Sequence, residues 1–220
     1  MTAPASAADT RIIVFARAPE PGAVKTRLIP LLGAARAAAL QRILIDRAIT
    51  TALAAGIGPV ELWCAPSARH PLLAGFAEGH GISAASQCDG DLGARMLHAA
   101  VVALASTPRV IIIGADCPAL TTDDLRRTAA ALVNHHDAVL IPAEDGGYVL
   151  IGLKWWDARL FADVAWGTDQ VMTATRERLA ALNWRWLELP CAWDVDRPAD
   201  FRRLAASGLI ADLEAGLDSR

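Results

Sequence analysis

A group of cationic residues follows the first apolar run of the chain. The run Arg11–Ala16 leads into a loop with two prolines that carries Arg17, Gly22, Lys25 and Arg27. A guanidinium group offers a planar fork of donors and an ammonium group a compact point charge, and together they suit a polyphosphate. A turn with solvated charges is the alternative. Because the chain has a net charge of -3, we favour a phosphate-binding loop over solvated charges.

Aspartates stand at two other points along the chain. Asp116 comes directly after Val110–Ile113, where a carboxylate is well placed to hold a cation. Asp194 and Asp196 would point to the same side of an extended segment, because side chains alternate. Magnesium typically binds through one or two protein carboxylates plus substrate phosphates. Conformational roles are the alternatives, since Asp116 also suits a turn and Asp196 also suits a helix N-cap.

Two glycine-marked loops extend the candidate site. Gly90, Asp91 and Gly93 precede a helical pattern whose amino end could meet an anion or a base edge. Gly146 and Gly147 follow an apolar run, and paired glycines let a ligand approach the backbone closely. Turn formation alone also explains such residues, so the prediction depends on their joint placement with the cationic loop and the aspartates.

The elements that position these loops alternate between short apolar runs and longer helical patterns. We expect strands at Arg11–Ala16, Val60–Ala65, Ile82–Ser86, Val110–Ile113, Ala138–Pro142, Gly147–Leu153 and Trp184–Leu189. We expect helices at Gly33–Gly56, at His70–Glu78, at Leu92–Ala105, from a cap at Thr121 or Thr122 to His135, from a cap at Thr168 to Leu182, and after Pro198. This alternation predicts an α/β protein with three layers, in which helices cover both faces of a mainly parallel sheet. Ligands then bind at the carboxyl ends of the strands.

Composition restricts the class of protein. No linker or repeat divides the chain, so residues 11–220 are expected to form one domain after a disordered segment at 1–10. Those ten residues lack the pattern of a signal peptide, and no apolar run approaches the ~18 residues of a membrane span. The four cysteines show no CxxC spacing, which indicates reduced thiols. We expect a cytoplasmic protein that binds neither membrane nor nucleic acid, since a mildly acidic chain has no basic block for phosphates.

Tryptophan is concentrated in the last third of the chain, with six of the seven after Leu150. Core packing, or the apolar interface of a homodimer, is the first interpretation. Trp166 is the one that we single out for an acceptor pocket, because an indole ring can stack on a sugar. The motifs of common alternatives are missing: no glycine immediately precedes Lys25 as in a Walker A loop, and neither GxGxxG nor GxSxG occurs.

Five segments, taken in order, resemble a known family. They read FARAPEPGAVKTRLIPLLG, GDLGARM, GADCPAL, PAEDGGYVLIGL and DVDRPADF. In this combination the chain resembles the DUF2064 family of glycosyltransferase A-like (GT-A) proteins, from about Arg11 to Arg203. The resemblance implies the Rossmann-like fold of nucleotide-diphospho-sugar transferases. KTRL at Lys25–Leu28 also looks like the guanylyltransferases of deazaflavin cofactor synthesis.

The resemblance also implies roles for particular residues. Asp116 matches the metal-binding aspartate of the superfamily, and Asp196 matches a second metal-side carboxylate, with Asp194 as the alternative. The ion would be Mg²⁺ or Mn²⁺. The first loop would bind the nucleotide phosphates, and the loop of Gly146 and Gly147 would face the sugar or the acceptor. The GxGTR loop of typical sugar nucleotidyltransferases is missing.

Three functions follow as expectations. The first is metal-dependent transfer from a nucleotide-activated sugar to a small-molecule acceptor, with Lys25 and Asp116 catalytic and Asp145 or Glu144 orienting or deprotonating the acceptor hydroxyl. The second is nucleotidyl transfer to a phosphorylated acceptor with release of pyrophosphate. The third is a nucleotide-binding protein without catalysis. Both reactions need the same cation and phosphate contacts, so the motifs do not separate them.

Overall fold

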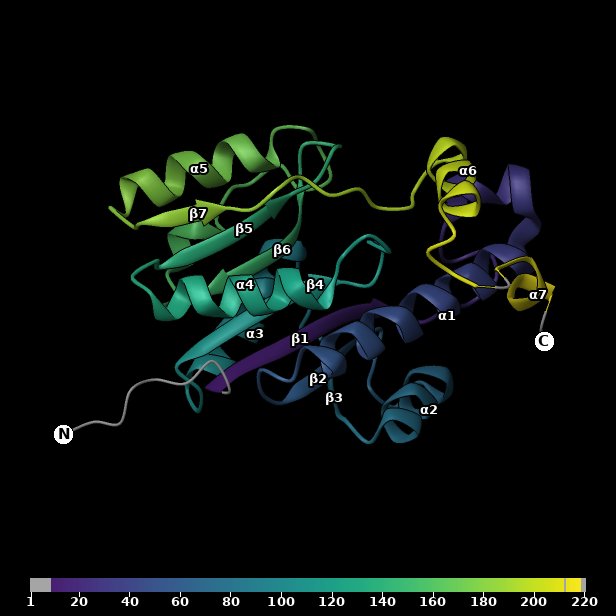
Figure 1. The fold of residues 1–220 in the computed structure, drawn as a ribbon, viewed down its shortest axis with the longest axis horizontal. Helices are drawn as coiled ribbons and strands as arrows, with labels where there is room; N and C mark the ends of the chain where they lie inside the picture. Colours follow the sequence, from purple (N-terminus) through teal and green to yellow (C-terminus); the bar gives the residue numbers. More distant parts are fainter. Residues whose placement is uncertain (1–8, 212, 219–220) are drawn as a thin grey trace.

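Seven strands form one mixed sheet in the computed structural model, which describes residues 9–211 and 213–218 (Figure 1). The spatial order is β3-β2-β1-β4-β6-β5-β7. Every neighbouring pair is parallel except those of β6, which runs antiparallel to both β4 and β5. The strands are β1 (Thr10–Arg17), β2 (Val60–Ala65), β3 (Ser83–Ser86), β4 (Arg109–Gly114), β5 (Ala138–Pro142), β6 (Tyr148–Leu153) and β7 (Trp186–Glu188).

Helices cover both faces of this sheet, which confirms the predicted three-layer α/β architecture. In β1, Ile12 and Val14 face one layer and Ile13 the other, and all three are fully buried, as a strand between two helix layers requires. The layer beside Ile12 and Val14 contains α1 (Ile29–Ala55), α2 (Pro71–His80) and α4 (Thr122–Val133). The layer beside Ile13 contains α3 (Leu92–Leu104), the short 3-10 helix η3 (Ala158–Leu160) and α5 (Val171–Ala181).

A third apolar cluster joins the two ends of the chain beside the sheet. It packs the 3-10 helix η2 (Thr26–Leu28) and α1 against α6 (Pro198–Ser207) and α7 (Leu213–Asp218). The amino end of α1 lies next to α6 and α7 in Figure 1. Trp193 and Val195 belong to this cluster. The cluster therefore anchors the segment that carries the predicted second carboxylate.

The long first helix corrects one expectation from the sequence. By length and composition, Thr26–Ala55 could cross a membrane, with a mean hydropathy of 1.5 in its most apolar window. The helical geometry is broken at Gly33, where φ is 77°. Almost half of the window is buried inside the protein, and residues such as Ile45 and Ile49 pack against the sheet. The apolar face of this helix therefore packs against β1 and β2.

Most predicted elements are confirmed to within two residues. Thr121 caps α4 and forms a capping box with Asp124, as the sequence indicated. The predicted cap at Thr168 is wrong, since α5 begins at Val171 and its N-cap is Gln170. Of the segment 1–10, residues 1–8 lie outside the described residues, whereas Thr10 already belongs to β1.

Candidate active site

Lys25 joins three segments that are far apart in the sequence. It follows the turn after β1 in a left-handed conformation, with φ 47°, and its side chain is only 5% exposed. Its ammonium group donates to the Asp116 carboxylate beyond β4 and to the carbonyl oxygen of Val195 at 2.7 Å. The backbone N–H of Val195 in turn donates to the carbonyl oxygen of Asp116 at 2.9 Å. The loop of the first cations and the β4 loop therefore meet, as expected for loops that follow parallel strands, and the DVD segment joins them.

A cavity of about 390 Å³ opens beside this junction. We call it the cationic cavity, because three cations and two carboxylates line it. Arg27 forms an ion pair with Asp196 across its rim, and Gln41 of α1 is 4% exposed in its wall. The residues that line it are Phe15, Arg17, Ala23, Val24, Lys25, Thr26, Arg27, Gln41, Asp116 and Asp196.

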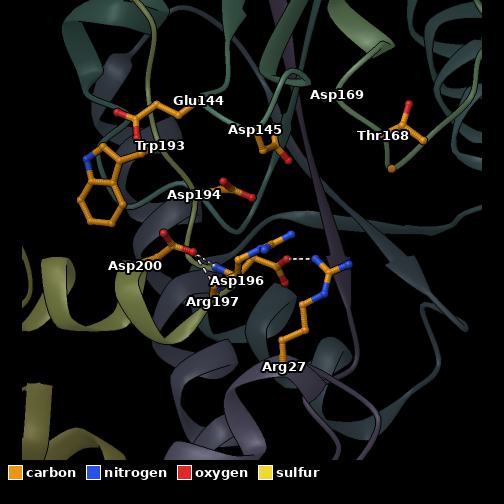
Figure 2. Close-up of a pocket in the computed structure, with 11 residues that line it drawn as sticks. Arg27, Glu144, Asp145, Thr168, Asp169, Trp193, Asp194, Asp196, Arg197 and Asp200 are labelled. Atoms are coloured by element: carbon orange, nitrogen blue, oxygen red, sulfur yellow. Dashed lines mark hydrogen bonds and ion pairs between the residues drawn. The ribbon is translucent and has the colours of Figure 1, made fainter.

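A second cavity, of about 500 Å³, adjoins the first and shares Arg27 and Asp196 with it (Figure 2). Six carboxylates and two guanidinium groups line this acidic cavity. Figure 2 shows that Asp145, Asp194 and Asp196 extend into the same space, with Thr168 on the far side. The lining residues are Arg27, Glu144, Asp145, Gly167, Thr168, Asp169, Trp193, Asp194, Asp196, Arg197 and Asp200.

Two carboxylates of the acidic cavity, Glu144 and Asp200, accept hydrogen bonds from the protein itself. Arg203 donates to Glu144 at 2.8 Å and places its guanidinium carbon 4.4 Å from the ring centre of Trp193. Asp200, in the first turn of α6, accepts the backbone N–H groups of Asp196 at 3.1 Å and of Arg197 at 2.6 Å. Asp200 therefore fixes the backbone on which Asp196 sits.

Asp145 and Asp194 lie nearer the middle of the acidic cavity. Asp145 accepts the backbone N–H of Gly147 at 2.9 Å. The pKa of Asp194 is raised to about 6, first by burial and then by the negative charges of Asp145 and Asp116, while the charge of Lys25 opposes the shift. Trp193 and Val195, on either side of Asp194, are buried, which agrees with the predicted alternation of side chains. Like charges are thus crowded at one point, where a bound cation would relieve their repulsion.

The residues present fit a divalent cation that is shared with phosphate. Among the residues that the structure describes, no three His, Cys, Asp or Glu side chains form a ready metal cage. Asp116 instead contacts Lys25, and Asp196 contacts Arg27. Magnesium does not need such a cage, since one or two carboxylates and substrate phosphates suffice. Of the predicted ligands, Asp116 lines the cationic cavity, Asp194 the acidic cavity and Asp196 both, and their role in metal binding stays a prediction.

An apolar recess of about 160 Å³ adjoins the acidic cavity and shares Asp145, Gly167, Thr168 and Asp194 with it. The predicted acceptor residues Trp166 and Gly147 both line this recess. The other lining residues are Leu92, Ala143, Tyr148, Val149 and Val171.

Aromatic packing fixes the wall of the recess. The rings of Trp166 and Tyr148 meet edge to face, with centroids 6.3 Å apart. Trp166 also packs against the start of α3, because Gly93 leaves room there: a Cβ at Gly93 would lie 2.6 Å from the indole Nε1. The Tyr148 hydroxyl donates to the Met96 sulfur at 3.6 Å, and burial raises the pKa of Tyr148. Tyr148 is therefore a neutral wall residue rather than an acid or a base.

Other predicted site residues lie outside these three cavities. Asp91 is the N-cap of α3 and accepts the N–H of Ala94 at 2.8 Å. Gly146 is needed for packing, since a Cβ there would lie 2.4 Å from the Asp169 carbonyl oxygen. Nucleotide binding by Gly22, Gly90, Asp91 and Gly93, and acceptor binding by Gly146, stay predictions without support from the cavities.

Sequence reasoning missed several residues that line the two larger cavities. Gln41 could have been identified from the sequence, because an amide on the alanine-rich face of a helix is unusual among core residues. Asp169 and Arg197 could not, since exposed charges in loops are common. The proximity of Asp169 to Asp194 arises only when the loop before α5 is placed.

Comparisons with known proteins show which solved structures share this fold. A candidate nucleotide-diphospho-sugar transferase from Desulfovibrio desulfuricans G20 has a TM-score of 0.81 and 29% identity over 96% of this chain and 97% of its own. A cytidylyltransferase from Leptospira borgpetersenii gives 0.62 and 14%, over 94% and 89% of the two chains. Glucosyl-3-phosphoglycerate synthase from Mycobacterium tuberculosis, solved with Mn²⁺, UDP and glucosyl-3-phosphoglycerate, gives 0.54 and 11%, over 96% and 80%. The fold is thus shared with nucleotidyl- and glycosyltransferases.

No curated protein matches the chain. A family model does match, over residues 48–168, and its description is "Uncharacterized protein conserved in bacteria (DUF2064)". The match covers more than half of the 220 residues, and it includes the β4 loop with Asp116 and the loop with Asp145. The chain belongs to the DUF2064 family.

Proposed function

We propose that the protein is a divalent-metal-dependent transferase that acts on a nucleotide-activated sugar. The observation that carries the proposal is the position of Lys25, whose buried ammonium group contacts Asp116 and the carbonyl oxygen of Val195 in the wall of the cationic cavity, which adjoins the acidic cavity. A nucleoside diphosphate needs cations for its phosphates, and the transferred sugar must emerge beside its acceptor. The cationic cavity supplies the first requirement and the adjoining acidic cavity the second.

The phosphates of the donor would occupy the cationic cavity. Arg17, Lys25 and Arg27 supply hydrogen-bond donors and positive charge there. Mg²⁺ or Mn²⁺, held by Asp116 and by Asp196 or Asp194, would neutralise charge on the diphosphate. When the sugar leaves, negative charge grows on the diphosphate oxygen, and Lys25 and Arg27 stabilise it electrostatically.

The acceptor hydroxyl would be oriented by Asp145. This carboxylate lines both the acidic cavity and the recess, whereas Glu144 is paired with Arg203 at 2.8 Å. Asp145 is therefore the better candidate of the two for accepting the hydroxyl proton. The fold relatives give general support, since one of them was solved with Mn²⁺ and UDP.

The first experiment is a thermal-shift panel of nucleoside triphosphates, nucleoside diphosphates and nucleotide sugars, each with and without Mn²⁺. A ligand that binds the folded state raises its stability, by about 2.7 kcal/mol at a hundredfold excess over Kd. We expect a metal-dependent shift with one nucleotide sugar, and we expect Asp116→Asn to lose it. Glu177→Gln is the matched control, because Glu177 is exposed on α5 and its substitution removes the same charge.

Other outcomes distinguish the remaining functions. A metal-dependent shift confined to a triphosphate would favour nucleotidyl transfer instead. A shift that survives in Asp116→Asn, without turnover of the donor in any condition, would favour binding without catalysis. If no nucleotide shifts the folded protein, the proposal is wrong.

A further inference from the structure

The two larger cavities differ in the charge that they present. The cationic cavity sets Arg17, Lys25 and Arg27 against two carboxylates. The acidic cavity sets six carboxylates against two guanidinium groups, and one of these, Arg27, is already paired with Asp196. An anion is therefore attracted on one side of the Arg27–Asp196 pair and repelled on the other.

The negative charge of the residues that line the acidic cavity disfavours binding of a phosphorylated or carboxylated reactant. A phosphate group placed near its centre would meet Asp145 and Asp194, and like-charge juxtaposition across an interface is strongly unfavourable. Hydroxyl groups bind favourably there, because ionised carboxylates only accept hydrogen bonds and hydroxyls can donate them. Thr168, which also lines the cavity, offers a neutral polar group on the facing side.

The recess places a second, independent requirement on the ligand. Leu92, Ala143, Val149 and Val171 line it together with the rings of Tyr148 and Trp166. Asp145 and Asp194 line both the recess and the acidic cavity, so the two spaces adjoin there. A ligand that fills both spaces must therefore carry hydroxyl groups at one end and a short apolar group at the other.

We propose that the acceptor is a hydroxyl compound without an anionic group and with a short apolar end, bound with its hydroxyls at Asp145 and its apolar end in the recess. This inference rests on the proposed function, because it treats the acidic cavity as the acceptor side of a donor bound at Lys25. It excludes a phosphate monoester as acceptor, which the nucleotidyl-transfer alternative requires.

The test is binding to the protein saturated with the nucleotide and Mn²⁺ that give the largest thermal shift. Ligand-detected NMR titrations would use sets of three matched compounds. Each set contains a methyl glycoside or methyl ether of a neutral polyol, its n-butyl analogue and its phosphate monoester. We expect the phosphate to bind at least about tenfold more weakly than the methyl compound. We expect the butyl compound to bind more tightly, by up to about fourfold for each buried methylene.

Two variants test which residues cause these differences in affinity. Leu92→Trp fills the recess from a residue that is 45% exposed, and Leu72→Trp on α2 is its control at 37% exposure. We expect only Leu92→Trp to remove the advantage of the butyl compound. Asp145→Asn should reduce the discrimination against phosphate, whereas Glu177→Gln should not.

The failures are distinguishable from one another. If no nucleotide shifts the protein, the proposed function fails and the acceptor inference falls with it. If the nucleotide binds but the phosphate outranks the neutral compound, only the acceptor inference is overturned. It is also overturned if no set binds, or if the butyl advantage is missing or survives in Leu92→Trp.

Discussion

The ammonium group of Lys25 is ion-paired with the carboxylate of Asp116, although 91 residues separate them in the sequence. The lysine side chain is 5% exposed and the aspartate side chain 49% exposed. Burial of Lys25 therefore carries a desolvation cost, which only its partners offset, and Asp116 remains open to an incoming ion. The pair holds the site together before any ligand binds, and it places a cation where a phosphate would arrive.

Removing the charge of Lys25 separates these two roles. We expect Lys25→Met to lower the free energy of unfolding by about 1–2 kcal/mol, less than the ~3–5 kcal/mol for a fully buried pair, because water reaches Asp116. We also expect it to abolish the nucleotide-dependent thermal shift. Urea unfolding and the shift assay measure the two effects.

Two further variants test that interpretation. Lys154→Met removes the other lysine of the chain, which lies away from both larger cavities, and should change neither quantity. The double variant Lys25→Met, Asp116→Asn should recover part of the stability but not the nucleotide shift. If the double variant binds nucleotide normally, neither residue contacts the ligand.

Asp194 makes stability depend on pH in a defined direction. Its pKa in the folded protein is about 6, above the ordinary 3.8, so folding favours the protonated form. The contribution of Asp194 to the free energy of unfolding therefore decreases as the pH rises from about 4 through about 6, and it is constant above that range. Two pKa units correspond to about 3 kcal/mol, which partial exposure reduces to about 1–2 kcal/mol.

We expect Asp194→Asn to become progressively more stable than the unsubstituted protein between about pH 4.5 and pH 7.5. Urea unfolding in the presence of a chelator measures the difference, because a bound metal would hide it. Glu177→Gln, which removes an exposed carboxylate, should show no such trend. A constant difference across the pH range would mean that Asp194 is not desolvated.

The fold and the centre of the site were predictable because their signals are local. An apolar run such as Val110–Ile113 is buried on both faces wherever it is placed in a parallel sheet, so Asp116 had to lie at its carboxyl edge. Thr121 and Asp124 form their capping box within one helical turn. The meeting of Lys25 and Asp116 follows from the rule that parallel strands end at the same edge.

The rest depends on contacts that no local pattern encodes. β6 reads as a buried strand in either direction, and its antiparallel course is set by pairing with β4 and β5. Thr168 has the residue type of a cap, but its hydroxyl donates to the carbonyl oxygen of Ala165 at 2.7 Å, and α5 begins three residues later. The division into two cavities of opposite charge follows from the Arg27–Asp196 pair, which joins residues 169 apart.

The thiols offer a chemical check of burial around the site. Burial raises the pKa of Cys64 to about 11 and that of Cys117, next to Asp116, to about 12. Because the thiolate is the reactive form, we expect neither to react with iodoacetamide at about pH 8 in the folded protein. Cys191 is exposed and should be labelled before both of them, although burial and the charges of Glu144 and Asp145 raise its pKa. Mass spectrometry of tryptic peptides measures the order, and early labelling of Cys117 would contradict the structure.

Gly146 ties the Asp145 loop to the start of α5. Its carbonyl oxygen accepts the N–H of Met172 at 2.8 Å, and its φ is 90°. A Cβ there would lie 2.4 Å from the Asp169 carbonyl oxygen, which is backbone and cannot move without shifting α5. We therefore expect Gly146→Ala to cost more than the ~1 kcal/mol of a left-handed alanine, at about 2–4 kcal/mol.

Gly167→Ala is the matched control for this prediction. Gly167 also has a positive φ, of 80°, but nothing lies within 4 Å of the place that a Cβ would take, so only the backbone cost of about 1 kcal/mol should appear. Because the clash at Gly146 would displace Asp145, we also expect Gly146→Ala to weaken binding of the neutral hydroxyl compound at constant nucleotide affinity. Equal losses of stability in the two variants would show that the contact between Gly146 and Asp169 is looser than described, and that Asp145 is not held by it.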